Sequence, residues 1–244
     1  MTSPSHAIFI RSYYKDAEWL RYCLRSCREY APDTRAVIVS PPDSEAAIRP
    51  IAAEFGHEFY VVPVTHKNGY IDQQFTKITA DQWVDEDYII HLDSDCLLLC
   101  PLDALFHMER PVMLKTAWKL LAGDQAVVWR GVVDGALGIN PDFEFMRRHP
   151  LVYPRTIYPR VRAALEARHG SLVDWFRRQT AFSEFNVLGA WCHQHAYDEF
   201  HWIDTEHDPL PPPFVRQGWS WGGFEAARAE WESIVSKYGQ PATS

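Results

Sequence analysis

The sequence has few cysteines and no long apolar run, and each shortage excludes a class of protein. Its five cysteines are odd in number and form no Cys-x-x-Cys pair, so neither a disulfide framework nor a structural zinc site is indicated. No run approaches the roughly 18 to 20 apolar residues that cross a bilayer. The first residues also lack the basic and apolar regions of a signal peptide. We therefore expect a protein of the reducing cytoplasm without a membrane segment.

Two glycine-rich nucleotide-binding motifs are missing as well. The chain has 12 glycines, but none are spaced as Gly-x-Gly-x-x-Gly or as Gly-x-x-x-x-Gly-Lys-Ser/Thr. The first motif holds a dinucleotide in dehydrogenases, and the second holds phosphates in P-loop proteins. The sequence therefore lacks the motif that each of these two enzyme classes needs.

Positive charge is scarce overall but concentrated in one segment. The net charge of −8 argues against non-specific nucleic-acid binding by the whole surface. Residues 147–178, however, carry eight arginines against only Glu166 and Asp174. This segment is either an ordinary solvated face of one or two helices, or a surface that meets a phosphate-rich acceptor.

The first hundred residues alternate between short apolar runs and amphipathic segments. A hydrophobic fraction of 47% with 10 tryptophans indicates a folded core, and 244 residues fit one α/β domain. Alternating strands and helices are typical of a doubly wound, mostly parallel sheet flanked by helices. The expected strands are 7–10, 36–39, 58–64 and one that ends at Asp93, and the expected helices are 17–30, 44–55 and 72–83.

The second half is less regular, although no long linker or repeat divides it from the first. We expect a single domain over 1–244, with a nucleotide-binding half (7–100), an acceptor and catalytic half (101–223) and a C-terminal helix (224–244). Expected strands are 111–115, 125–129, 137–141 and 200–203. Expected helices are 142–148, 155–169, 172–180, one that opens with Ser183 as its cap, and 224–238.

The most informative stretch is an apolar run that delivers two carboxylates together, Asp93 and Asp95. In an extended strand end the side-chain period of two points both the same way. Two carboxylates about 4 Å apart repel by about 4 kcal/mol at an effective dielectric near 20. A hard cation such as Mn²⁺ or Mg²⁺ would relieve that repulsion. The alternative is a plain turn after a strand, with both carboxylates solvated.

Four segments stand in an order that is typical of a known family. They are the turn after the first strand (11–16), the segment 73–77, the Asp-x-Asp strand end (93–95) and the segment 183–186. Together they resemble the GT-A-fold, nucleotide-sugar-dependent glycosyltransferases, especially small bacterial and phage members. The resemblance covers about residues 7 to 223. It implies a GT-A (Rossmann-like) single domain with a mixed, mostly parallel central sheet.

The resemblance also implies roles for individual residues. Asp95 and Glu184 would be catalytic, and the metal ligands would be Asp93, Asp95 and a histidine, for which His207 is chosen over His201. Contacts to the nucleotide sugar, a UDP-sugar in the first instance, would come from Arg11, Ser12, Tyr13, Asp16, Gln74, Lys77, Asp93, Ser94, Asn186, Trp219 and Trp221.

Each of these roles has a plain structural alternative. Asp16 is also placed to cap the following helix, and Glu184 suits a helix N-terminus. The tryptophans near 220 are also typical of a buried aromatic turn. If Glu184 is catalytic, it serves as general base in an inverting reaction or stabilises an oxocarbenium-like centre in a retaining one.

Three other functions compete with hexosyl or pentosyl transfer. A nucleotidyltransferase shares the sheet and the cation, although such enzymes carry a glycine-rich loop after the first strand. A haloacid-dehalogenase-type phosphatase also uses Asp-x-Asp, but normally on its first strand. The third alternative is an inactive sugar-binding module. For a glycosyltransferase the acceptor stays open between a glycan and a hydroxymethylated DNA base, which would have to be flipped out of its duplex.

Overall fold

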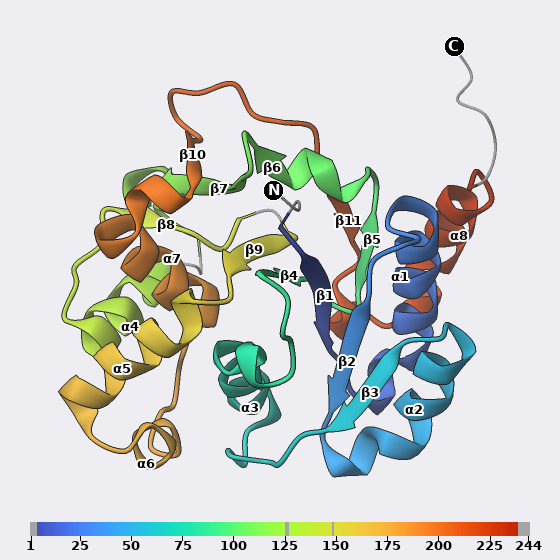
Figure 1. Cartoon of the computed structure of the whole chain (residues 1–244), viewed down its shortest axis with the longest axis horizontal. Helices are drawn as coiled ribbons and strands as arrows, with labels where there is room; N and C mark the ends of the chain where they lie inside the picture. Colours follow the sequence, from blue (N-terminus) through green and yellow to red (C-terminus); the bar gives the residue numbers. More distant parts are fainter. Residues whose placement is uncertain (1–3, 125–126, 148, 239–244) are drawn as a thin grey trace.

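A computed structural model describes residues 4–124, 127–147 and 149–238 of the chain. A five-stranded sheet lies at its centre, in the order β3-β2-β1-β4-β9 (Figure 1). Neighbouring strands from β3 to β4 run parallel, and β9 runs antiparallel to β4. The predicted mostly parallel sheet is therefore confirmed. The strands are β1 (His6–Arg11), β2 (Ala36–Ser40), β3 (Glu58–Val61), β4 (Tyr88–His91) and β9 (Leu151–Pro154).

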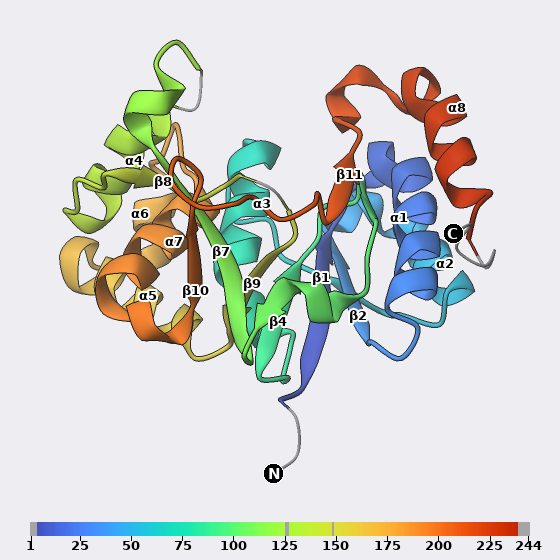
Figure 2. The ribbon, with the colours of Figure 1, turned by 90° about the horizontal axis from the view of Figure 1, so that it is seen from above.

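Both faces of the inner strands β1, β2 and β4 are buried, because these strands are apolar at consecutive positions, whereas the edge strand β3 is partly exposed. Ile8 and Ile10 of β1 pack into one hydrophobic cluster with α1 (Ala17–Tyr30) and α2 (Glu45–Glu54). Ala7 and Phe9 face the other way, into a cluster shared with α3 (Gly69–Ile78), α5 (Ile157–His169) and α7 (Glu184–His195). Figure 2 shows the two groups of helices on opposite sides of β1. Burial on both faces is what parallel sheets require.

The second half of the chain adds a smaller sheet and a helical group. Strand β10 runs parallel to β7, which is flanked antiparallel by β6 and β8, and β11 pairs antiparallel with β5. The strands are β5 (Cys96–Leu98), β6 (Phe106–His107), β7 (Arg110–Ala117), β8 (Phe143–Glu144), β10 (His201–Asp204) and β11 (Val215–Gln217). The helices are α4 (Val128–Leu137), α5 (Ile157–His169), α6 (Leu172–Phe176), α7 (Glu184–His195) and α8 (Phe224–Val235).

Three predictions for this half are wrong. The expected strand 125–129 runs into α4, with Gln125 and Ala126 outside the described residues, and 137–141 begins at the end of that helix. Gly138 ends α4 in the left-handed region (φ +68°), a conformation that glycine adopts at little cost. The expected helix 142–148 is instead strand β8 followed by a loop, because Phe143 and Glu144 pair with β7.

Helix α8 packs on the outside of α1. The Trp231 ring lies 4.6 Å from that of Trp19, and Phe224 makes a second edge-on contact with Trp19 at 5.0 Å. Both tryptophans are essentially unexposed. The segment before α8 is thereby held next to β5, at the carboxyl end of the central strands. No helix within the described ranges has the length and apolar character needed to span a bilayer.

Candidate active site

Two adjoining cavities open where the central parallel strands end. The larger has a volume of about 890 Å³ and the smaller about 450 Å³. They share Tyr70 and Gln73 of α3 and Asp93, which follows β4. Open α/β sheets bind ligands at this edge, outside the carboxyl ends of their strands. The shared wall means that ligands in the two cavities would meet at Asp93.

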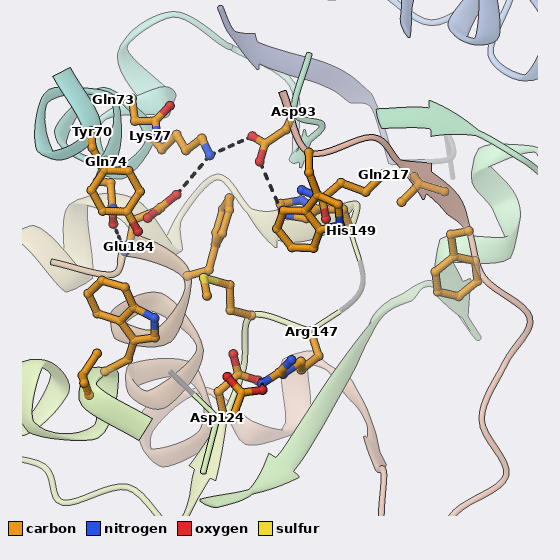
Figure 3. A pocket seen from close by; sticks show the side chains of 18 of the residues that line it. Tyr70, Gln73, Gln74, Lys77, Asp93, Asp124, Arg147, His149, Glu184 and Gln217 are labelled. Carbon is orange, nitrogen blue, oxygen red and sulfur yellow. Dashed lines mark hydrogen bonds and ion pairs between the residues drawn. The ribbon is translucent and has the colours of Figure 1, made fainter. Parts of the chain in front are cut away.

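A buried lysine joins two carboxylates at this junction (Figure 3). The Nζ of Lys77 on α3 lies 2.7 Å from Oδ1 of Asp93 and 3.1 Å from Oε1 of Glu184, the first residue of α7. The side chains of Lys77 and Glu184 are only 6% and 5% exposed. Three segments distant in sequence therefore meet in one ion-paired group.

Lys77 and Asp93 keep their charges in spite of burial. Burial favours the neutral amine, but Asp93 and Glu184 raise the pKa of Lys77 above its usual value. Burial likewise disfavours the carboxylate of Asp93, yet Lys77 and His149 hold its pKa below the usual range. His149 Nε2 lies 3.5 Å from Asp93 Oδ2. This histidine lies in the loop between β8 and β9 and is not among the residues singled out from the sequence.

Asp95 and Asp16 line the smaller cavity together with Asp93. Burial raises the pKa of Asp16 to about 7, and the charges of Asp95 and Asp93 push in the same direction. Burial and Asp93 also raise the pKa of Asp95. Carboxylate oxygens are the ligands that a hard divalent cation such as Mn²⁺ or Mg²⁺ prefers, so the chemistry of these donors fits such an ion. By distance, the group of described residues whose ligand atoms all lie within 4.8 Å of one another is a different one, Asp204, Glu206 and His207.

Backbone groups from the segment after β11 close over Asp95. The Ser220 N–H donates to Asp95 Oδ2 at 2.8 Å, and the Gly218 N–H donates to the Asp95 carbonyl at 2.7 Å. A Cβ on Gly218 would lie 2.2 Å from the Trp19 ring, so only glycine fits there. The close contact between Gly218 and α1 thus holds the segment after β11 next to Asp95.

No protein-family model matches the sequence, and no curated protein matches it. Solved structures do match. The galactosyltransferase LgtC, crystallised with donor and acceptor sugar analogs, aligns over 96% of this chain and 97% of its own at 12% identity, with a TM-score of 0.56. The chain has a GT-A glycosyltransferase fold. WbbM, a bifunctional glycosyltransferase, aligns over 83% of this chain and 39% of its own at 12% identity, with a TM-score of 0.51. A cytidylyltransferase from Leptospira borgpetersenii covers all of both chains at 11% identity, with a lower TM-score of 0.48.

Within this GT-A fold, the turn after β1 borders the smaller cavity. Arg11, Tyr13 and Asp16 line it together with Ser94 and Asp95. Arg11 is held by an ion pair with the buried Asp72 (Nη2 to Oδ2, 3.3 Å), and Asp16 Oδ2 accepts a hydrogen bond from Ser94 Oγ at 3.0 Å. Ser12 is fully buried and does not belong to the lining. Asp16 precedes α1 but makes no side-chain cap bond.

Gln74 and Asn186 hold the start of α7. Gln74 Oε1 accepts from the Glu184 backbone N–H at 3.0 Å, and Gln74 also lines the larger cavity. Asn186 is fully buried, accepts from the Phe145 N–H at 2.8 Å and donates to Ser183 Oγ at 2.9 Å. It lines neither cavity. Ser183 stands at the N-cap position, but its side chain makes no cap bond to the helix backbone.

The remaining predicted site residues lie on the C-terminal part of the GT-A fold. Trp219 is 56% exposed, adopts a φ of +55° and lines the larger cavity. The structure describes Trp221 in its backbone only. His207 is exposed, pairs with Asp204 at 3.5 Å and lines neither cavity. With Glu206 these two form an exposed acidic group beyond β10. The other candidate, His201, lies against His107, with ring centroids 4.1 Å apart and ring planes inclined by 32°.

The arginine-rich segment is largely neutralised by carboxylates. Its ion pairs are Arg147–Asp124 (2.8 Å), Arg160–Glu199 (2.8 Å), Arg162–Asp81 and Arg177–Asp174 (3.6 Å). Arg148 lies outside the described residues. Four of the eight arginines therefore already face an acidic partner. The segment offers less free positive charge to a phosphate backbone than its composition implies.

A second polar group, formed by Asp124, Glu144 and Arg147, lies in the wall of the larger cavity. Arg147 Nη2 is 2.8 Å from Asp124 Oδ2, and Arg147 Nε is 3.6 Å from Glu144 Oε2. Glu144 is completely buried, and neither of its carboxylate oxygens has a hydrogen-bond partner among the described residues. Burial raises the pKa of Glu144 to about 7, against the opposing effect of Arg147.

This raised pKa gives a testable pH dependence of stability. A carboxyl whose pKa is raised from 4.5 to about 7 on folding makes the protein less stable as the pH rises through that window. We expect Glu144→Gln to abolish this loss, gaining about 2–3 kcal/mol relative to the unsubstituted protein between pH 5 and pH 8. Urea unfolding at the two pH values measures the difference. Parallel curves for both proteins would show that Glu144 does not titrate in this range.

Proposed function

We propose that the protein transfers a sugar from a nucleotide-diphosphate sugar, in the first instance a UDP-sugar, to an acceptor hydroxyl. The observation that carries this proposal is the placement of Lys77 between Asp93 and Glu184, where the two cavities of a GT-A fold meet. A nucleotide in the smaller cavity would place its diphosphate at Asp93. The transferred sugar would then lie beside Lys77 and Glu184, and the acceptor in the larger cavity.

The reaction breaks the bond between the anomeric carbon and a diphosphate oxygen and forms one to the acceptor oxygen. Lys77 supplies fixed positive charge beside the leaving group, where negative charge grows in the transition state. In an inverting reaction Glu184 accepts the proton of the acceptor hydroxyl. In a retaining reaction Glu184 stabilises positive charge at the anomeric carbon, and the proton leaves with the nucleoside diphosphate. Product stereochemistry distinguishes these two roles.

The crowded carboxylates support a metal-dependent reaction. Asp93 and Asp95 would hold Mn²⁺ or Mg²⁺, with Asp16 next to them. When bound, the cation would stabilise the departing diphosphate as a Lewis acid. His207 pairs with Asp204 and lines neither cavity, so nothing in its placement supports it as the third ligand.

A donor screen by thermal shift tests the proposal. Each nucleotide sugar is added with Mn²⁺ and again with excess chelator. A ligand at 100 times its dissociation constant adds about 2.7 kcal/mol of stability, or roughly 5–10 °C for a chain of this size. We expect one nucleotide sugar to give such a shift with Mn²⁺ and to lose most of it with chelator.

A product assay then separates the competing functions. Glycosyl transfer or donor hydrolysis releases a nucleoside diphosphate, whereas nucleotidyl transfer from a nucleoside triphosphate to a sugar phosphate releases pyrophosphate. Release of the diphosphate from the stabilising donor supports the proposal. Pyrophosphate release alone, or the absence of stabilisation by every nucleotide sugar, would refute it.

A further inference from the structure

The larger cavity carries a polar group that the proposed chemistry does not use. Figure 3 shows Asp124 and Arg147 facing each other, away from the Lys77–Asp93 pair. Their side chains are 40% and 38% exposed, so a ligand in the cavity can reach both. Asp124 precedes α4 and Arg147 follows β8, so two separate segments converge on this point of the wall.

Arg147 also forms an ion pair with a buried carboxylate, that of Glu144. Glu144 lies 3.6 Å from Arg147 Nε, belongs to the cavity wall and is fully buried. Glu144 and Arg147 Nε face each other without a hydrogen bond of ordinary geometry, so the charge of the buried Glu144 is compensated mainly by Arg147. A buried ion pair is costly to desolvate, so Glu144 orients Arg147 at the cavity wall at some expense of stability.

The charge of the cavity restricts what can bind there. Its carboxylates are Asp93, Asp124, Glu184 and Glu144, of which Glu144, with a pKa of about 7, is only partly ionised at neutral pH. Lys77 and Arg147 of the lining are both already paired with carboxylates, so an acceptor with phosphate or carboxylate groups would have to displace one of these pairs. An uncharged, hydroxyl-bearing acceptor would leave both pairs in place. Its hydroxyls can donate to Asp124 and accept from Arg147 at the same time.

Aromatic side chains complete a surface that suits a sugar ring. Tyr70 of α3 and Trp129 of α4 both line the cavity, with ring centroids 6.4 Å apart and planes inclined by 30°. The exposed Trp219 lines it as well. Aromatic rings with a polar edge pack well against amphipathic ligands.

We propose that Asp124 and Arg147 form an acceptor subsite, and that the acceptor is an uncharged saccharide whose hydroxyls bind this pair. Glu144 is a positioning residue that orients Arg147. The assignment rests on the proposed function, because it places the acceptor opposite a nucleotide-sugar donor. It selects a saccharide over a hydroxymethylated DNA base, because Arg147 is already paired with Asp124 and is not available to the phosphates that flank such a base.

The test compares a neutral with a charged p-nitrophenyl glycoside of similar shape, and both with a DNA acceptor. With the donor found in the thermal-shift screen, we expect transfer to at least one neutral p-nitrophenyl glycoside, at a kcat/KM about tenfold or more above that for p-nitrophenyl glucuronide or hydroxymethylcytosine DNA. Preference for the DNA or the glucuronide would overturn the inference. So would donor hydrolysis without transfer to any neutral glycoside.

Variants then test the residues themselves. We expect Asp124→Asn and Arg147→Gln to raise the KM for the neutral acceptor by about tenfold or more, with a far smaller change in the donor KM. Arg177→Gln, which removes an exposed arginine paired with Asp174 on α6, serves as the matched control. Equal acceptor KM values in all three variants would refute the subsite while leaving the proposed function intact. Absence of donor turnover in the unsubstituted protein would refute the proposed function itself.

Discussion

Replacement of Lys77 by methionine is expected to lower the free energy of unfolding by about 3–5 kcal/mol and to abolish donor turnover. The substitution removes the one cation within 3.1 Å of both Asp93 and Glu184 in the part of the chain that the structure describes. The buried Glu184 would then lose its cation, and Asp93 would keep only His149 as an ion-pair partner among the described residues. The same change withdraws positive charge from the proposed leaving group, for which we expect a loss of at least about 10²-fold in kcat.

A second lysine provides a matched control for this prediction. Lys115 on β7 pairs with Asp204 at 3.2 Å, with both side chains about 15% exposed, and it lines neither cavity. Lys115→Met should cost less stability, because it leaves one carboxylate rather than two without a lysine partner, and should leave turnover intact. Denaturant unfolding and nucleoside diphosphate release measure the two effects. A Lys77→Met protein within about 1 kcal/mol of the unsubstituted protein would contradict the ion-pair argument.

Replacement of Asp95 by asparagine should separate stability from activity. Because burial and Asp93 raise the pKa of Asp95, its ionised form is destabilising in the folded protein. The neutral amide removes that repulsion, and its oxygen can still accept from the Ser220 N–H. We therefore expect an unchanged or higher melting temperature, together with a loss of at least about 10³-fold in donor turnover if the carboxylate holds the cation.

The decisive measurement for Asp95→Asn is its response to Mn²⁺ with the donor. The variant should lose most of the thermal shift that Mn²⁺ adds, whereas Asp174→Asn, an exposed site on α6, should retain it. Full turnover in Asp95→Asn, or an undiminished Mn²⁺ response, would show that this carboxylate does not bind the metal. A lower melting temperature would show that its charge stabilises the fold.

The sequence predicted the first half of the fold well, because local pattern and tertiary context agree there. Helix 17–30 has one apolar stripe and its predicted bounds are those of α1, and the four parallel strands are short apolar runs. The second half depends on long-range pairing. Residues 143–144 form a strand only because β7 lies beside them, and β9 and β11 are short strands that were not predicted.

The same distinction applies to the candidate site. The Asp-x-Asp strand end and Lys77 could be found by pattern, and the structure brings Asp93, Lys77 and Glu184 into contact. His149 and Glu144 could not, because a lone histidine and a lone glutamate in an irregular segment carry no periodic or spacing signal. Their significance comes from burial and from their neighbours, which exist only in three dimensions.

The hydrogen bonds between the segment after β11 and Asp95 have a consequence for biosynthesis. Asp95 receives hydrogen bonds from Ser220 and Gly218, and α8 anchors that segment by packing Trp231 on Trp19. A ribosome makes Asp95 more than a hundred residues before these partners. The emerging polypeptide can build its parallel sheet early, but the loop that carries Asp93 and Asp95 reaches its final shape only after residues 218–231 have left the exit tunnel. Catalytic competence would thus be acquired late in translation, even though the sheet that carries it forms first.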